Sequence, residues 1–168
     1  VVPPAEDLRL YEIGAAPSAE RIEADIRRLV SFGTRHSLSE TVSDTRGIGA
    51  ARRWVQEEFE RISAACGGCL EIRVIGDTVS GEPRIPTPHE IVSVVAIQAG
   101  SSDPNRMVMM SGDIDSRVSD PMDRLSDSPG ANDNASGLAG LLEAAWVLTQ
   151  YEFPGSIVYA ALAGEEQG

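Results

Sequence analysis

Three short segments of this chain place carboxylates where strands and helices are expected to meet. The carboxylates belong to Asp113, Asp115, Asp133, Glu165 and Glu166. The first pair and the last pair each follow an apolar run, and Asp133 precedes a predicted helix. In an open α/β sheet, ligands bind beyond the carboxyl ends of the strands. Carboxylate oxygens bind divalent cations, and carboxylates that meet without a cation repel one another. The three segments therefore predict a metal site at one edge of a sheet.

Each segment taken alone has an ordinary explanation. Asp113 and Asp115 suit an acidic turn, residues 132–134 suit a helix N-cap, and a pair of glutamates suits a solvent-facing strand end. A calcium loop of the EF-hand type starting at Asp113 is excluded, because Val118 and Arg124 stand where it needs glycine and glutamate. Adjacent side chains of an extended chain point apart, so one glutamate can bind a metal while the other acts as a base. The three segments in this order favour a shared site.

The elements that must position these residues alternate between helices and strands. Apolar residues recur at helical spacing over 18–30, 44–65 and 134–150, with Ser18 as an N-cap. Strands are predicted over 70–75, 91–97, 107–110 and 157–162, the third of them short and buried. The continuous apolar run at 157–162 is typical of a sheet that is covered on both faces. The pattern indicates a single α/β domain over residues 1–168.

With their neighbours, the acidic segments resemble the co-catalytic zinc aminopeptidases, metallopeptidase family twenty-eight. The resemblance rests on residues 32–37, 47–52 before Trp54, 126–133 and 157–168. It implies a three-layer α/β/α sandwich with a mixed, mostly parallel central sheet, of which this chain is the N-terminal portion. It also implies two zinc ions at the strand ends of the intact domain.

By position, the resemblance assigns a role to each carboxylate. Asp133 would bridge the two metals, Glu166 would ligate one zinc ion, and Glu165 would be the general base. Asp115 would orient the ligand two residues before it. That ligand is histidine in the family and Asp113 in this chain. The extra carboxylate predicts a raised carboxylate pKa and a weakened second metal position.

The resemblance implies an exopeptidase, an aminopeptidase that removes N-terminal residues from peptides through a metal-activated water. Relatives also include carboxypeptidases and a glutaminyl cyclase, so the substrate class stays open. The family's further acidic ligand and late histidine have no counterpart here, and neither His36, expected to be structural, nor His89 matches a ligand position. We therefore expect one zinc ion or none, and no catalysis by these 168 residues alone. The alternative is a non-catalytic pseudopeptidase that serves as a binding domain.

Net charge and apolar runs limit the classes of partner that the chain is expected to bind. The net charge of −12 argues against nucleic acid, whose phosphates require a basic face. No apolar run is long enough to span a membrane. The resemblance implies a peptide substrate as the partner, and the oligomeric state is open. Two glycines between Cys66 and Cys69, at a helix–strand junction, favour a small disulfide over a redox motif or a structural zinc site, with two free thiols as the alternative. A disulfide fits a secreted or periplasmic protein whose signal peptide is absent or already removed.

Overall fold

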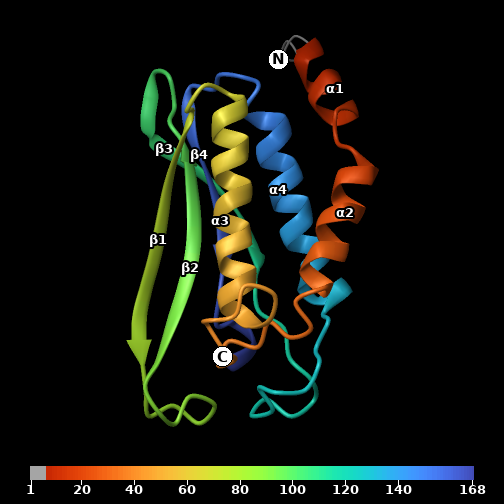
Figure 1. The fold of residues 1–168 in the computed structure, drawn as a ribbon. Coiled ribbons are helices and arrows are strands. Elements are labelled where there is room, and N and C mark those ends of the chain that lie inside the picture. The colour runs from red at the N-terminus through yellow and green to blue at the C-terminus, as the bar shows by residue number, and fades with distance from the viewer. Residues whose placement is uncertain (1–6) are drawn as a thin grey trace, which may run out of the picture.

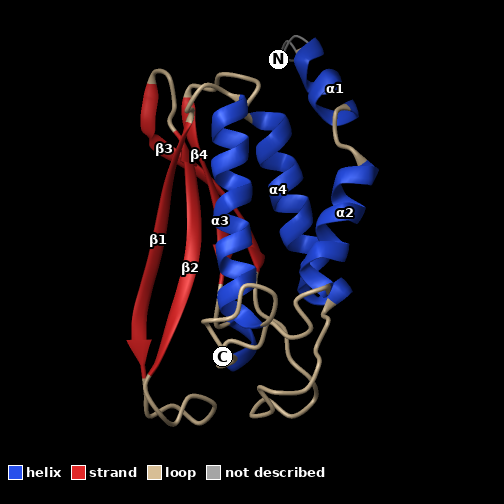
Figure 2. Cartoon of the chain, viewed as in Figure 1, coloured by secondary structure: helices blue, strands red, loops and turns tan. Residues whose placement is uncertain are grey.

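A computed structural model describes residues 7–168 of the chain (Figures 1 and 2). Its helices are α1 (Leu8–Ala15), α2 (Ala19–Val30), α3 (Gly47–Ala65) and α4 (Ser136–Leu148). Its strands are β1 (Leu70–Val79), β2 (His89–Gln98), β3 (Asp103–Asp113) and β4 (Gly155–Leu162). Two short helical turns, η1 (Ala131–Ala135) and η2 (Glu165–Gln167), complete the chain. Within this range, none of the helices has the length and apolar character needed to cross a membrane.

The strands form one mixed sheet in the order β1-β2-β4-β3. β1 and β2 pair antiparallel, β2 and β4 pair antiparallel, and β3 and β4 pair parallel. The predicted α/β class with a mixed sheet is confirmed, but two of the three strand pairs in the described residues are antiparallel, so this part of the sheet is not mostly parallel as expected. Because β3 and β4 run in the same direction, their carboxyl ends lie at the same edge of the sheet, and both acidic strand ends are found there.

Helices α3 and α4 lie side by side against the sheet, and α2 packs against α4 (Figure 1). The predicted periodicity is confirmed, because buried positions recur at helical spacing along α3 and α4. Their side chains meet those of the central strands in one core, which includes Val55, Phe59, Ile62, Leu138, Leu142, Val94 and Tyr159. A large apolar side chain that becomes fully buried contributes about 1.5–3 kcal/mol, so this core holds the helices firmly on the sheet.

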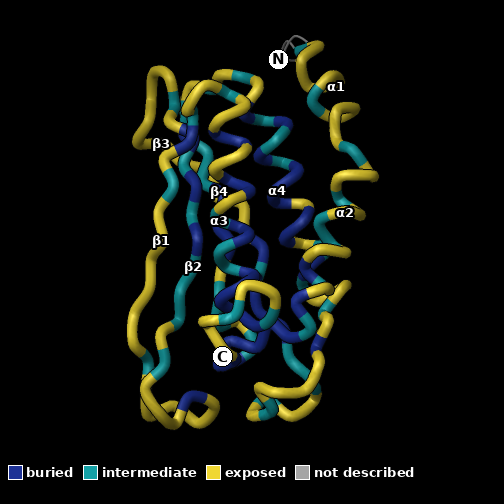
Figure 3. The backbone as a smooth tube through the Cα atoms, in the orientation of Figure 1, coloured by how far each residue is buried: buried dark blue, intermediate teal, exposed yellow. Residues whose placement is uncertain are grey.

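Strand β3 differs from its prediction as a short buried strand. It is longer than predicted, and its apolar residues Met107, Val108 and Met109 are 59%, 64% and 65% exposed (Figure 3). Within residues 7–168, β3 pairs only with β4, so its other edge is open. The apolar run is typical of a buried strand, but in the described residues the contacts of β3 with β4 and α4 leave these three side chains mostly exposed.

Other differences have local causes. The structure contains α1, which the sequence analysis does not predict; this helix is short, and none of its residues is buried. Strand β1 continues past the predicted end at residue 75 to Val79. Gly76 fits inside the strand because a Cβ there would lie 2.7 Å from Cγ2 of Val92, so this glycine relieves crowding rather than ending the strand.

Two local predictions are confirmed. Ser18 caps α2, and its side chain accepts a hydrogen bond from the N–H of Arg21 at 3.2 Å. Cys66 and Cys69 form a disulfide in the loop between α3 and β1. So short a loop restricts the unfolded chain only weakly, so the bond is expected to add little stability.

Candidate functional site

The parallel pairing of β3 and β4 brings the first and last acidic segments together. Asp113, the last residue of β3, stands opposite Leu162 at the end of β4. The N–H of Ile114 donates to the carbonyl of Leu162 at 2.6 Å, so the pairing extends one residue past the strand. The turn at 164–166, which carries Glu165 and Glu166, begins two residues later. The predicted convergence of these two segments at one sheet edge is therefore found.

The middle segment reaches the same edge through α4. Asp133 lies in η1, directly before that helix, and its backbone there is extended rather than helical. Gly112 of β3 packs against the helix start, where a Cβ would lie 2.9 Å from the backbone of Gly137 and Leu138. Only glycine at 112 allows so close an approach of the helix to the strand. We call the edge that bears Asp113, Asp115, Asp133, Glu165 and Glu166 the acidic edge.

Asp115 is a buried residue of the acidic edge that binds the turn at 164–166. It is 1% exposed, and its Oδ2 accepts hydrogen bonds from Ser37 Oγ at 2.6 Å and from the N–H groups of Gly164 and Glu166 at 3.1 Å each. The carboxylate therefore fixes the turn on which both glutamates stand. Its second oxygen, Oδ1, is buried and has no hydrogen-bond partner in the described residues. The orienting role that the resemblance gives Asp115 is thus directed, in these contacts, at the turn rather than at residue 113.

The carboxylates of the acidic edge influence one another. Burial raises the pKa of Asp113, and the charges of Asp115, Glu165 and Asp133 raise it further. The direction of this shift agrees with the predicted effect of carboxylate crowding, but burial is its largest cause. Burial also raises the pKa of Glu166, against the lowering effect of Arg117. Both shifts mark a place where negative charge is incompletely balanced.

Arg117 is a neighbour of the site that the sequence reasoning did not single out. Its Nε lies 2.6 Å from Oε2 of Glu166, which makes a close ion pair whose geometry is too bent for a hydrogen bond. The side chain of Glu166 is 11% exposed, so the pair is mostly shielded from water. The only signal in the sequence is an arginine two residues after Asp115, which is too common a pattern to be informative.

The two histidines lie as structural residues rather than as ligands. His36 is fully buried: its Nδ1 accepts from the N–H of Leu38 at 3.0 Å, and its Nε2 lies 3.0 Å from the carbonyl of Pro121. His89 is half-buried at the start of β2, with Nδ1 2.9 Å from the carbonyl of Thr87. Both rings are engaged with backbone groups, so neither joins the acidic edge.

The acidic edge provides part of a metal site. Its donors are carboxylate oxygens, which suit a divalent cation, and the raised pKa of Asp113 shows charge that a cation would relieve. Catalytic zinc, however, takes three protein ligands, usually with histidine among them. Within residues 7–168, no three histidine, cysteine or acidic side chains are grouped closely enough to hold a metal ion. The donors fit a cation in kind, but they are too few and too widely spaced to hold one by themselves.

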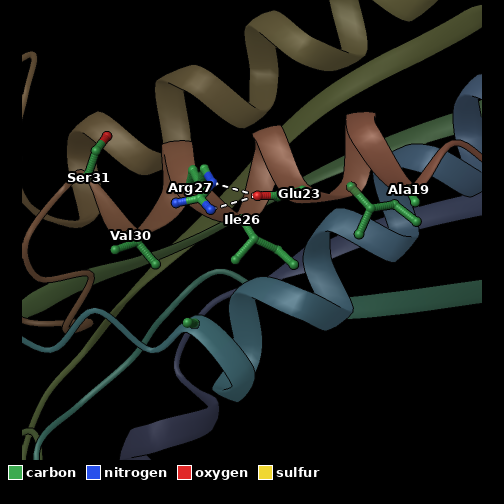
Figure 4. A pocket seen from close by; sticks show the side chains of 8 residues that line it. Ala19, Glu23, Ile26, Arg27, Val30 and Ser31 are labelled. Atoms are coloured by element: carbon green, nitrogen blue, oxygen red, sulfur yellow. Dashed lines mark hydrogen bonds and ion pairs between the residues drawn. The ribbon is translucent and has the colours of Figure 1, made fainter.

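A separate apolar groove runs along α2 (Figure 4). It has a volume of about 690 Å³ and is lined mainly by one face of the helix, where Glu23 and Arg27 form an ion pair. Ala131 of η1 closes one side of it, but none of the five carboxylates of the acidic edge lines it. The groove is therefore distinct from the candidate site.

Comparison with known proteins decides the family. Residues 93–168 match the model of peptidase family M28. Over 168 residues, the chain is 46% identical to a protein of Pyrenophora teres f. teres named probable zinc metalloprotease. The chain belongs to family M28. It spans 35% of that relative's length, so the relative contains a long region that has no counterpart in these 168 residues.

Solved structures share the fold. A leucine aminopeptidase precursor from Bacteroides thetaiotaomicron aligns with a TM-score of 0.65 at 18% identity, covering 88% of this chain and 47% of that one. A glutaminyl cyclase from Porphyromonas gingivalis aligns with a TM-score of 0.66 at 21% identity, covering 90% and 47%. The two names denote different reactions, so the fold of this M28 chain does not by itself fix its chemistry.

Proposed function

We propose that the intact protein is a zinc-dependent exopeptidase that removes N-terminal residues from peptides. The observation that carries the proposal is the meeting of Asp113 with the turn of Glu165 and Glu166 at the ends of two parallel strands. Membership of family M28 and the name of the relative support zinc and peptide hydrolysis. The resemblance noted in the sequence supports removal of the N-terminal residue. The net charge of −12 supports a peptide partner over nucleic acid.

In this proposal, the chain's own carboxylates divide the work. Asp113, Asp133 and Glu166 would each supply a zinc ligand, and the remaining ligands would come from the part of the longer protein that this chain does not include. When bound, zinc lowers the pKa of a water molecule and polarises the scissile carbonyl. Glu165 is exposed at the acidic edge and, within residues 7–168, forms no ion pair. It is therefore free to take a proton from the attacking water and pass it to the leaving amine.

A non-catalytic binding domain is the second candidate. Two observations favour it: Asp113 stands where the resembled family has histidine, and Glu166 is already paired with Arg117. In this reading, the arginine replaces the cation that the carboxylates once held. The turn at 164–166 favours catalysis, because its hydrogen bonds to Asp115 fix the backbone that carries both glutamates.

Two variants of the full-length natural protein separate these functions. Glu165→Gln should retain zinc and lose about 10²–10⁴-fold in kcat on an aminoacyl p-nitroanilide, because it removes the base but not a ligand. Glu166→Gln should lose zinc together with activity. Glu152→Gln, at an exposed acid outside the acidic edge, is the matched control and should change neither.

An N-acetylated substrate and the isolated 168-residue chain provide two further tests of the exopeptidase proposal. The same p-nitroanilide with an acetylated amino group should not be cleaved, and the 168 residues alone should be inactive. A wild-type full-length protein that contains zinc but cleaves neither substrate would refute the exopeptidase proposal. Peptide binding without zinc or turnover would establish the binding domain.

We also propose that the protein is secreted or periplasmic. The Cys66–Cys69 disulfide supports an oxidising compartment. Protein isolated from its natural source under alkylating conditions should show no free thiols at these positions by mass spectrometry. Two alkylated cysteines would contradict the proposal.

A further inference from the structure

Arg35 is a fully buried arginine whose guanidinium binds backbone carbonyl groups. Nε donates to the carbonyl of Ile114 at 2.8 Å, and Nη2 donates to that of Gly130 at 3.1 Å. Nη1 donates to the carbonyls of Pro129 at 2.7 Å and Leu29 at 3.2 Å. In the described residues, no carboxylate oxygen is among its hydrogen-bond partners. The guanidinium therefore joins separate pieces of backbone instead of forming a salt bridge.

Those pieces carry the two acidic segments that flank the site. Ile114 lies between Asp113 and Asp115, in what we call the β3-end segment (residues 113–116). Pro129 and Gly130 belong to the η1 segment (residues 128–134), which contains Asp133. Leu29 is part of α2, so the same guanidinium also ties both segments to a helix. A rigid fork of donors sets the spacing of the groups that it binds.

Further contacts around Arg35 tighten the same link. Its N–H donates to Ser116 Oγ at 3.2 Å, and that hydroxyl donates to the carbonyl of Ser128 at 2.7 Å. Gly130 has a φ of +47°, and a Cβ there would lie 3.0 Å from Nη2 of Arg35. There is little room for the two segments to shift relative to each other.

The arrangement is costly if its only purpose is stability. Burial lowers the pKa of Arg35 to about 10, and the nearby charge of Asp115 opposes that shift. A buried charge costs several kcal/mol to desolvate, and even buried ion pairs can often be replaced by apolar side chains of similar volume without loss of stability. Packing alone does not explain why an arginine is buried at this position. A need for fixed geometry at the acidic edge does explain it.

We propose that Arg35 is a positioning residue that fixes the separation of the β3-end segment and the η1 segment, and through it the placement of Asp113 relative to Asp133. The importance of that placement for metal binding rests on the proposed function. The link between the two segments does not, and it can be measured without a metal.

Hydrogen exchange in the full-length protein, followed by mass spectrometry, tests the link. In Arg35→Leu, amides of the β3-end and η1 segments should exchange about tenfold faster or more, while those of α3 and β2 change no more than in a control. The control is Arg21→Leu, which removes an arginine that pairs with the buried Glu143 at 2.7 Å, away from these segments. Equal acceleration in all regions, or none in the two segments, would overturn the proposal.

Arg35→Lys is the second variant, and it decides the matter if Arg35→Leu does not fold. Lysine keeps the charge but, as a point charge on a flexible stem, does not reproduce the fork. The two segments should again exchange faster than the rest of the protein, and unchanged exchange would overturn the proposal.

Titration with Co²⁺ alone measures the consequence for the site. Arg35→Lys should weaken Co²⁺ binding about tenfold or more, as changes behind metal ligands commonly do. Selective exchange with unchanged Co²⁺ affinity would show that the link does not place the ligands. A wild-type protein that binds no Co²⁺ would refute the proposed function, whereas the exchange data would still decide the role of Arg35 as a link.

Discussion

Replacing Asp115 tests whether one buried carboxylate holds the turn that carries both glutamates. Asp115→Ala removes three hydrogen bonds to Oδ2, from Ser37 Oγ and from the N–H groups of Gly164 and Glu166. A hydrogen bond to a charged group contributes about 1.5–3 kcal/mol. The two N–H groups lie in a part-buried turn and regain water when the carboxylate is lost, so the contributions do not simply add. We expect a loss of about 3–5 kcal/mol in the free energy of unfolding.

A loss of this size is large against the total stability of a domain, which is typically about 5–15 kcal/mol. Urea unfolding at pH 7 measures it, provided that the m-value of the variant matches that of the wild type. Two comparison variants separate the causes. Asp115→Asn keeps an acceptor oxygen and should cost about 1–2 kcal/mol, while Ser37→Ala removes one of the three bonds and should fall in the same range.

The reasoning would be wrong if Asp115→Ala cost less than about 1 kcal/mol, the range of ordinary surface substitutions. It would also be wrong if Asp115→Asn were as destabilising as Asp115→Ala. In that case, the negative charge near Arg35, rather than the three hydrogen bonds, would be what the fold requires.

Three further perturbations have definite expected outcomes. Burial and the charges of Glu58 and Glu143 raise the pKa of Asp25 to about 6, so the stability gained from its protonated form is full below pH 3.8 and is lost as pH rises through about 6. Asp25→Asn should therefore raise the urea midpoint at pH 7 more than at pH 4, and equal gains would contradict this. Met109→Lys should reduce self-association of the 168-residue chain in sedimentation velocity, because an exposed apolar edge strand invites pairing, and unchanged association would count against that reading. Asp113→His in the full-length protein should raise the zinc content measured by mass spectrometry, since it removes one crowded carboxylate and adds a nitrogen donor; unchanged zinc and activity would show Asp113 to be an adequate ligand.

The regular elements are predictable from the sequence because burial imposes a spacing on them. The apolar stripe of α3 and the continuous run of β4 record which faces meet the core. The exposure of β3 is not predictable in this way. The apolar run at Met107 shows that the strand could be buried, but it does not show whether another element covers the strand. Helix α1 is not predicted for a different reason: it has only eight residues and none of them is buried, so burial imposes no clear spacing on it.

The candidate site divides along a similar line. Its carboxylates can be found from the sequence because each lies within about four residues of the end of a strand or the start of α4. The residues that hold them cannot. Arg35 binds carbonyls that lie 79 to 95 residues further along the chain, and Ser37 binds a carboxylate 78 residues away. A carbonyl group is present at every position, so no residue type marks the partners of Arg35.

The balance of charge at the acidic edge explains why protonation and metal binding must compete there. Five carboxylates meet two arginines, and one of these, Arg35, gives its hydrogen bonds to backbone carbonyls. Arg117 balances Glu166 directly, yet burial still leaves the pKa of Glu166 raised. The pKa of Asp113 is raised by burial and by three neighbouring carboxylates. A raised pKa means that the proton leaves only at higher pH, and a carboxylate must lose its proton before it can bind a metal. Cation uptake at this edge should therefore strengthen as pH rises through the range in which Asp113 and Glu166 ionise, and a bound cation should in turn draw both pKa values down.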